Sequence, residues 1–173
     1  MSKSVLQFVM LFVGMLLAQV ICNRICLFGV AVPMVFIYFI IRLPMNMSVN
    51  WVVCLSFLLG LCVDIFGDTQ GMNALASTML AMSRKWVFSL YFPREDDLGN
   101  PIPSIRSLGI AVYAKYMVTA VLLYCTVVFL IQAFALKHFE ITLLRIVSST
   151  ILTFLVLLGF DSIATTRRRE KRL

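Results

Sequence analysis

The chain has 173 residues, of which 61% are hydrophobic and only 13% charged, and its formal net charge is +7. Soluble domains contain about 45–50% apolar and about 25% charged residues, so this composition excludes an ordinary soluble domain. A mean hydropathy of +0.98 favours an apolar surrounding for most side chains. In lipid the backbone must satisfy its own hydrogen bonds, which leaves helices or a closed barrel as spanning elements. The apolar runs are long and do not alternate as barrel strands do, so we expect an all-α, polytopic integral membrane protein.

About six transmembrane helices are expected, forming one domain over residues 1–173. They cover residues 4–22, 28–43, 51–66, 72–91, 108–136 and 141–164. The second segment is short for a span of about 20 residues and contains Pro33, so a tilted or broken helix is expected there. The first segment ends without the small residues of a signal-peptide cleavage site, and we expect it to be retained as a helix.

The connections between these segments are short and polar, with one exception. Residues 67–71 read Gly-Asp-Thr-Gln-Gly and predict a tight turn. The exception covers residues 92–107, where three prolines and five charged residues predict a cytoplasmic loop. A second turn is expected at residues 137–140, and residues 165–173 form a basic cytoplasmic tail.

The basic residues are distributed unequally between the two ends of the predicted segments. Six segments place both termini on one side, and twelve of the fifteen Lys and Arg residues fall on that side. Only Arg24, Lys137 and Arg145 fall on the other. The positive-inside rule therefore predicts that both termini are cytoplasmic. Contact with anionic membrane lipids accounts for the net charge, and no basic face interleaved with aromatics predicts a nucleic-acid partner.

The sequence contains no recognisable arrangement for catalysis or for metal binding. The five cysteines lie within or beside apolar runs, there is one histidine, His138, and the pair Cys22 and Cys26 has no second pair at zinc-site spacing. We interpret the cysteines as small apolar packing residues. We expect no cofactor, no metal and no enzymatic activity.

Two acidic residues lie near the ends of apolar segments, Asp64 in the third and Asp161 in the sixth. An ionisable group at such depth costs about 3 kcal/mol on insertion scales and needs a partner. By depth, Arg145 is the expected partner of Asp64, and Lys115 that of Asp161. These pairs are interpreted first as pins between helices, with a proton or ion pathway as the alternative.

Gly60 lies one helical turn before Asp64, on roughly the same face of the third segment. A small residue there lets a neighbouring helix approach closely. A second step of small residues joins Gly14 and Ala18, and Gly71 has the same spacing from Gly67 but is more simply a turn residue.

The stretch Gly-Leu-Cys-Val-Asp-Ile-Phe-Gly-Asp-Thr-Gln-Gly-Met-Asn-Ala-Leu, residues 60–75, resembles the rod-shape-determining protein family MreD. That family carries a similar Gly-Leu-x-x-Asp stretch, then a short glycine-containing turn and a helix that begins with small residues. Chain length, hydrophobicity and the six-segment layout with a basic tail are also similar. The second segment is shorter than the family's pattern and the loop at residues 92–107 is longer.

The resemblance implies a non-enzymatic scaffold of the bacterial inner membrane that belongs to the elongation complex. It would bind MreC directly and act with MreB, RodA and a transpeptidase to guide peptidoglycan synthesis and cell shape. MreD proteins are similar in fold to the substrate-binding components of energy-coupling-factor transporters. The alternative is therefore a capture subunit for a vitamin or other small molecule, which would need a polar cavity open to the outside.

Overall fold

A computed structural model describes residues 3–23, 33–69, 71–92, 102–103, 105–136 and 139–170. The described residues are almost entirely helical, and no strand occurs among them. The helices are α1 (Lys3–Cys22), α2 (Ile37–Arg42), α3 (Val49–Gly67), α4 (Met72–Tyr91), α5 (Ile105–Leu108), α6 (Ile110–Leu136) and α7 (Phe139–Glu170). The predicted all-α class is confirmed.

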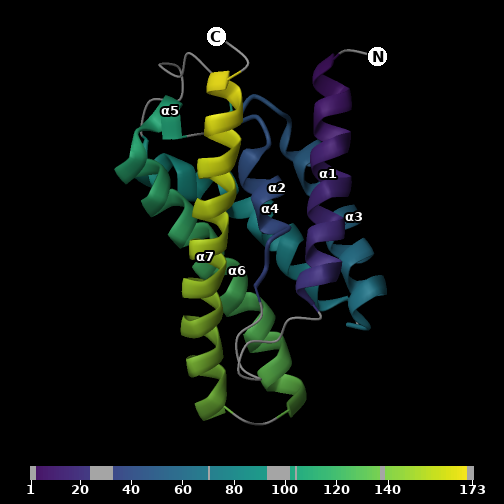
Figure 1. Ribbon diagram of the computed structural model, residues 1–173. Coiled ribbons are helices and arrows are strands. Elements are labelled where there is room, and N and C mark those ends of the chain that lie inside the picture. The colour runs from purple at the N-terminus through teal and green to yellow at the C-terminus, as the bar shows by residue number, and fades with distance from the viewer. Residues whose placement is uncertain are drawn as a thin grey trace.

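The helices α1 and α7 run along the length of the bundle, α6 crosses behind α7 at an angle, and the short helix α2 lies in the middle of the bundle (Figure 1). The helices α3 and α4 form an antiparallel hairpin, and α6 and α7 form another. The first turn of α1 and the last turn of α7 lie at the same end of the bundle (Figure 1). This agrees with an even number of passes along the bundle.

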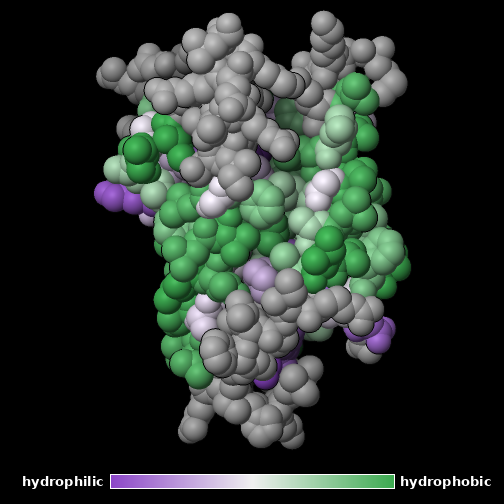
Figure 2. Space-filling view, viewed as in Figure 1, coloured by the Kyte–Doolittle hydropathy of each residue, from purple (hydrophilic) through white to green (hydrophobic). Residues whose placement is uncertain are grey.

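Apolar side chains cover the middle of the face shown in Figure 2. Three described helices contain stretches long and apolar enough to cross a membrane, namely Val49–Gly67, Ile110–Gln132 and Thr142–Asp161, and α1 adds the shorter apolar stretch Phe8–Cys22. The helix α4 carries the polar residues Asn73, Ser77 and Arg84 toward the interior, which lowers its hydropathy. The chain is therefore an all-α membrane protein.

Two exposed tryptophans mark one level of this surface. Trp51, in the first turn of α3, is 65% exposed, and Trp86, near the end of α4, is 80% exposed. Because α3 and α4 are antiparallel, the start of α3 and the end of α4 both lie toward the end of the bundle where α1 begins (Figure 1). Exposed tryptophans at one level are typical of a membrane–water interface.

The chain between α1 and α3 differs most from its prediction. A tilted or broken helix was expected over residues 28–43, but the described part, from Pro33, contains only the six-residue helix α2. Residues 28–32 lie outside the described residues. We call residues 33–48 the central segment. Its side chains from Val35 to Ile41 are at most 3% exposed, so this segment lies in the core and does not form a lipid-facing helix.

The non-helical start of the central segment obtains its hydrogen bonds from side chains of other helices. Gln19 of α1 accepts from the Val35 N–H at 2.7 Å and donates to the Pro33 carbonyl at 3.1 Å. Thr153 of α7 accepts from the Met34 N–H at 3.0 Å. Irregular backbone at membrane depth is tolerated only where protein groups satisfy it, and these two side chains do so here.

Several predicted boundaries are also corrected. The fifth segment is interrupted by Gly109, whose φ of 80° separates α5 from α6. The predicted loop at residues 92–107 therefore ends in a helical turn from Ile105, while residues 93–101 and 104 lie outside the described part. The last helix continues to Glu170, so much of the basic stretch predicted as a tail is helical.

Candidate functional site

Gly60 allows α3 and α4 to touch. A Cβ atom at this position would lie 2.7 Å from both the Ala74 Cα and the Asn73 carbonyl oxygen, and would also collide with Ser77 Oγ. Real Cβ atoms essentially never come within 3.0 Å of such neighbours. The hydroxyl of Ser77 donates to the carbonyl oxygen of Ser56 at 2.9 Å and ties the same two helices. The predicted close approach at Gly60 is confirmed.

The close contact at Gly60 brings the Asp64 carboxylate, one turn further along α3, to the first turn of α4. Its Oδ2 accepts from the Ala74 N–H at 2.8 Å. Its Oδ1 accepts from the Asn73 N–H at 3.1 Å, from Asn73 Nδ2 at 2.9 Å and from Thr69 Oγ1 at 2.5 Å. The first N–H groups of a helix have no partner within it, and a carboxylate there also faces the positive end of the helix dipole. Asp64 therefore caps α4 from a neighbouring helix.

The turn between α3 and α4 gives the Asp64 carboxylate this position. Asp68 ends α3 in the left-handed region with a φ of 52°, and Gly71 begins α4 with a φ of 74°. The N–H of Thr69 donates to the Asp64 carbonyl at 3.1 Å and closes the end of α3. Gly71 has no side chain to offer as a cap, so the cap comes from Asp64 instead. The predicted turn is present over its described residues.

A third helix joins the same group of side chains. The Tyr124 hydroxyl, on α6, donates to Asn73 Oδ1 at 2.5 Å, and Asn73 Nδ2 lies 3.0 Å from Thr69 Oγ1. Tyr124 is fully buried. We call Asp64, Thr69, Asn73 and Tyr124 the Asp64 network. Sequence reasoning did not select Asn73 or Tyr124, although a tyrosine within an apolar span signals a hydroxyl that needs a buried partner.

The predicted partner of Asp64 was wrong. Arg145, on α7, forms no ion pair with Asp64, whose oxygens are occupied by donors from the α3–α4 hairpin. Arg145 is partly exposed, and its Nε is enclosed without a hydrogen-bond partner. The pair of Asp64 and Arg145 was predicted because both residues lie at a similar depth in the membrane. The backbone N–H groups at the start of α4 instead stabilise the charge of the Asp64 carboxylate.

The second predicted acid, Asp161, lies in a cluster toward the other end of the bundle. The Tyr38 hydroxyl donates to Asp161 Oδ1 at 2.7 Å, and Arg42 Nη1 lies 3.3 Å from the same oxygen. Arg42 Nη1 also reaches the Pro103 carbonyl at 3.4 Å, and its guanidinium lies 5.6 Å from the centre of the Tyr38 ring. The cluster thus ties the central segment to α7 and to the chain before α5.

The predicted partner of Asp161 was also wrong. Lys115 is exposed on α6, and Arg42 of α2 takes its place. From the sequence, Arg42 is expected at the membrane surface, because it lies at the end of the predicted spanning segment at residues 28–43. The central segment instead carries Arg42 into the bundle, with its side chain only 14% exposed.

A second arginine, Arg84, holds the end of the central segment from α4. It is 4% exposed, and its Nη2 donates to the carbonyl oxygen of Leu43 and lies 3.2 Å from the sulfur of Met45. In the sequence, Arg84 is only one of the twelve basic residues on the side of the termini. Its structural position shows that it supports the connection from α2 to α3.

The described residues contain no group of three or more His, Cys, Asp or Glu side chains that could hold a metal ion. Cys22, Cys54, Cys62 and Cys125 are free thiols, while Cys26 and His138 lie outside the described part of the chain. The buried polar groups instead connect helices to one another. No protein-family model, curated protein or solved structure matches the chain.

Proposed function

We propose that the chain is a non-catalytic scaffold of the bacterial inner membrane that acts in the elongation complex, as the MreD family does. One observation carries the proposal. The stretch that resembles this family, residues 60–75, supplies the close contact at Gly60 and three of the four members of the Asp64 network. The residues behind the resemblance therefore have a shared structural task, which is to fix α3 and α4 against each other.

The use of the buried polar groups supports a scaffold rather than an enzyme. Asp64 caps a helix, Asp161 is held by Tyr38 and Arg42, and Gln19 satisfies backbone groups. A catalytic acid or base must be within reach of a substrate proton, whereas these groups face one another inside the bundle. Such a bundle offers its partners a rigid apolar surface in the membrane.

The proposed direct partner is MreC, with MreB, RodA and a transpeptidase in the same complex. Both termini are proposed to be cytoplasmic. The ends of α1 and α7 at one end of the bundle support a common side (Figure 1), and the excess of basic residues there supports the cytoplasmic one. A reporter fused to the C-terminus is expected to be active in the cytoplasm, and a periplasmic signal would contradict this orientation.

The alternative, a vitamin-capture subunit, needs polar groups that converge on a cavity. The hollow between α1 and α3 has a volume of about 350 Å³ and is lined only by apolar side chains, such as Phe12 and Leu55. Such a lining would leave the polar groups of a vitamin unpaired. The alternative therefore receives no support from this hollow.

Depletion and co-purification test the proposal together. Depletion from a rod-shaped bacterium that encodes the chain is expected to round the cells without creating a vitamin requirement. Tagged MreC is expected to co-purify with the wild-type chain and with the variant Leu144→Ala, which changes an exposed side chain of α7. Cells that remain rod-shaped but require a vitamin would overturn the scaffold in favour of the capture subunit.

A further inference from the structure

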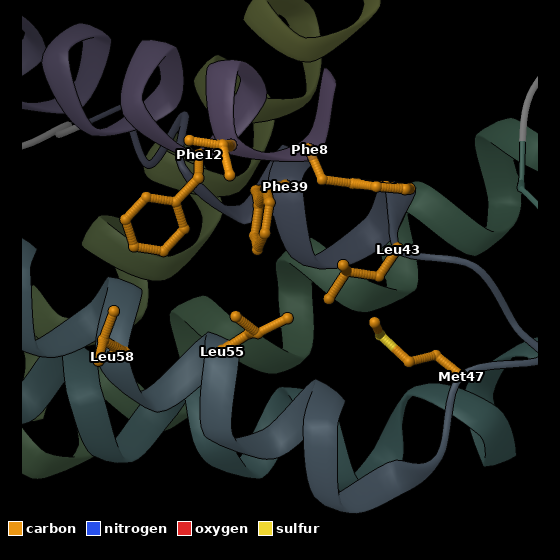
Figure 3. Close-up of a pocket in the computed structure, with 8 residues that line it drawn as sticks. Phe8, Phe12, Phe39, Leu43, Met47, Leu55 and Leu58 are labelled. Atoms are coloured by element: carbon orange, nitrogen blue, oxygen red, sulfur yellow. The ribbon is translucent and has the colours of Figure 1, made fainter. Parts of the chain in front are cut away.

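A hollow lies between α1 and α3 on the side of the bundle, with α2 as its floor (Figure 3). Its volume is about 350 Å³. The walls are Phe8 and Phe12 from α1 and Leu55 and Leu58 from α3, and the floor is Phe39 and Leu43. We call it the α1–α3 groove.

The α1–α3 groove opens onto the part of the surface that faces lipid. Val9 on one rim is 48% exposed and Leu58 on the other is 49% exposed, and exposed apolar side chains continue along both helices. From Trp51, which marks the interface, to Leu58 the helix rises about 10 Å. The α3 wall, Leu55 and Leu58, therefore lies about 6–10 Å from the level of Trp51 along the helix axis, within one leaflet of a hydrocarbon core about 30 Å thick.

The size of the groove selects among apolar occupants. A helix with its side chains is about 10 Å wide, so it could lie only across the mouth of so small a hollow. A lipid acyl chain is thin and flexible, and it is present wherever the groove meets the bilayer. An acyl chain in the groove would give the apolar walls the van der Waals contacts that an unfilled hollow lacks.

The interfacial end of the α1–α3 groove is basic. Met47 closes that end, and it also lines a small adjoining pocket together with Arg84 and Lys85. Arg84 is fixed by the Leu43 carbonyl, whereas Lys85 is only partly buried, one residue before the interfacial Trp86. An amphipathic ligand that places its apolar part in the groove would therefore place its head group beside positive charge.

We propose that the α1–α3 groove binds one acyl chain of an anionic glycerophospholipid, whose phosphate group lies at Lys85. The apolar lining selects the tail, and the charge at the Met47 end selects an anionic head group. The bound lipid belongs to the leaflet on the side where α1 begins. This inference is independent of the proposed partner proteins.

The test is native mass spectrometry of the purified full-length chain in micelles that contain equal amounts of phosphatidylglycerol and phosphatidylcholine. The wild-type protein is expected to retain one phosphatidylglycerol in preference to phosphatidylcholine. Two variants, Leu55→Trp and Val9→Trp, fill the groove from opposite walls and are expected to abolish this retention. Leu144→Trp, on exposed α7, adds the same side chain elsewhere and is expected to retain the lipid.

The head group is tested separately. Lys85→Gln is expected to reduce the preference for phosphatidylglycerol about fivefold, because one basic residue near an anionic membrane surface contributes about that factor. Lys115→Gln removes an exposed charge on α6 and is expected to leave the preference unchanged. Circular dichroism checks that each variant keeps its helical content, and Val9→Trp is the safer variant because Val9 is half-exposed.

Three outcomes would overturn the proposal. The first is retention of phosphatidylglycerol by folded Val9→Trp at the wild-type level. The second is equal retention of the two lipids by the wild-type protein. The third is a lipid-free dimer of the wild-type chain that becomes monomeric in both tryptophan variants, since a second copy would then occupy the groove.

Discussion

The α3–α4 hairpin and the central segment both depend on buried polar contacts, but their partners lie at different distances along the chain. In the hairpin, Asp64 accepts from groups five to ten residues ahead of it. In the central segment, Val35 is bound by a side chain 16 residues away, Met34 by one 119 residues away, and Tyr38 by one 123 residues away. The Asp64 carboxylate is thus held by local contacts, to which Tyr124 adds one from α6, whereas the central segment is held by contacts with other helices.

This difference indicates that the central segment depends on the rest of the bundle more than the hairpin does. The hairpin contains the main requirements for its own geometry, namely a close contact, a turn and a cap. The central segment has a short helix and an irregular start, and these are stable only when α1 and α7 surround it. We therefore expect changes at the central segment to affect the whole bundle, and changes at the hairpin to be smaller.

The largest effect is expected at the ion pair of the central segment. Asp161→Leu would leave Arg42 enclosed without its carboxylate, which costs about 3 kcal/mol in the free energy of unfolding. Unfolding by SDS titration in mixed micelles would measure this loss. The double variant with Arg42→Met is expected to lose less than the sum of the single variants, because neither charge remains alone.

The control for this double-mutant cycle is Lys115→Met. The depth of Lys115 in the membrane predicted it as the partner of Asp161. Its effect should add to that of Asp161→Leu, because Lys115 is exposed and the pair in the structure is Arg42 with Asp161. Coupling of Lys115 but not of Arg42 would reject the pairing described above.

A second large effect is expected at Gln19. Gln19→Leu preserves an apolar volume in α1 but leaves the Val35 N–H and the Pro33 carbonyl without their partner. Each buried polar group left unpaired costs about 1–3 kcal/mol, so the two groups together are expected to cost at least about 2 kcal/mol. Hydrogen exchange at the amide of Val35 should accelerate by more than exchange within α4. Equal acceleration in both regions would remove the distinction between them.

A smaller effect is expected at Gly60, in the hairpin. Gly60→Ala would force its new methyl group against the Ala74 backbone, and overpacking of this kind costs about 1–3 kcal/mol. Gly14→Ala is the matched control, since a Cβ atom there meets nothing within 4 Å and alanine favours helix. Melting temperatures in detergent should fall for the first and hold or rise for the second. A melting temperature at or above wild type for Gly60→Ala would contradict the close contact.

The smallest effect is expected at Tyr124. Tyr124→Phe removes one hydrogen bond from the Asp64 network and leaves the carboxylate cap intact, for a loss of about 1 kcal/mol. The loss should largely vanish in a background of Asn73→Ala, since the two residues share that bond. Additive losses in the same unfolding assay would show that Tyr124 acts through packing alone.

The sequence predicts the hairpin well because its requirements are local. The helix expected at residues 72–91 is observed as Met72–Tyr91, and that expected at 51–66 as Val49–Gly67. Apolar runs, turn residues and the small residue at position 60 are all present within a short stretch. The charge of Asp64 identified it as a residue that needs compensation, although the compensating groups proved to be backbone and side-chain donors.

The central segment could not be predicted in the same way. Its composition is as apolar as that of a spanning helix, and no local signal separates a lipid-facing helix from an enclosed segment of the same hydropathy. Gln19 and Thr153 are the residues that make the enclosed conformation possible, and each is an ordinary polar residue in an apolar run. The enclosed segment differs from a lipid-facing helix only in the hydrogen bonds that Gln19 and Thr153 form with the backbone of residues 33–35. These contacts form only when the whole chain is folded.

The length of α7 has a mechanical consequence. A helix over Phe139–Glu170 is about 48 Å long, whereas its apolar stretch, Thr142–Asp161, needs only about 30 Å to cross the hydrocarbon core. The part of α7 after Asp161 therefore extends about 13 Å beyond that apolar stretch as a continuous helix. Because Asp161 contacts Tyr38 and Arg42, the start of this helical extension is fixed to the central segment. Displacement of this helical extension by a bound partner would therefore be transmitted through Asp161 to the central segment.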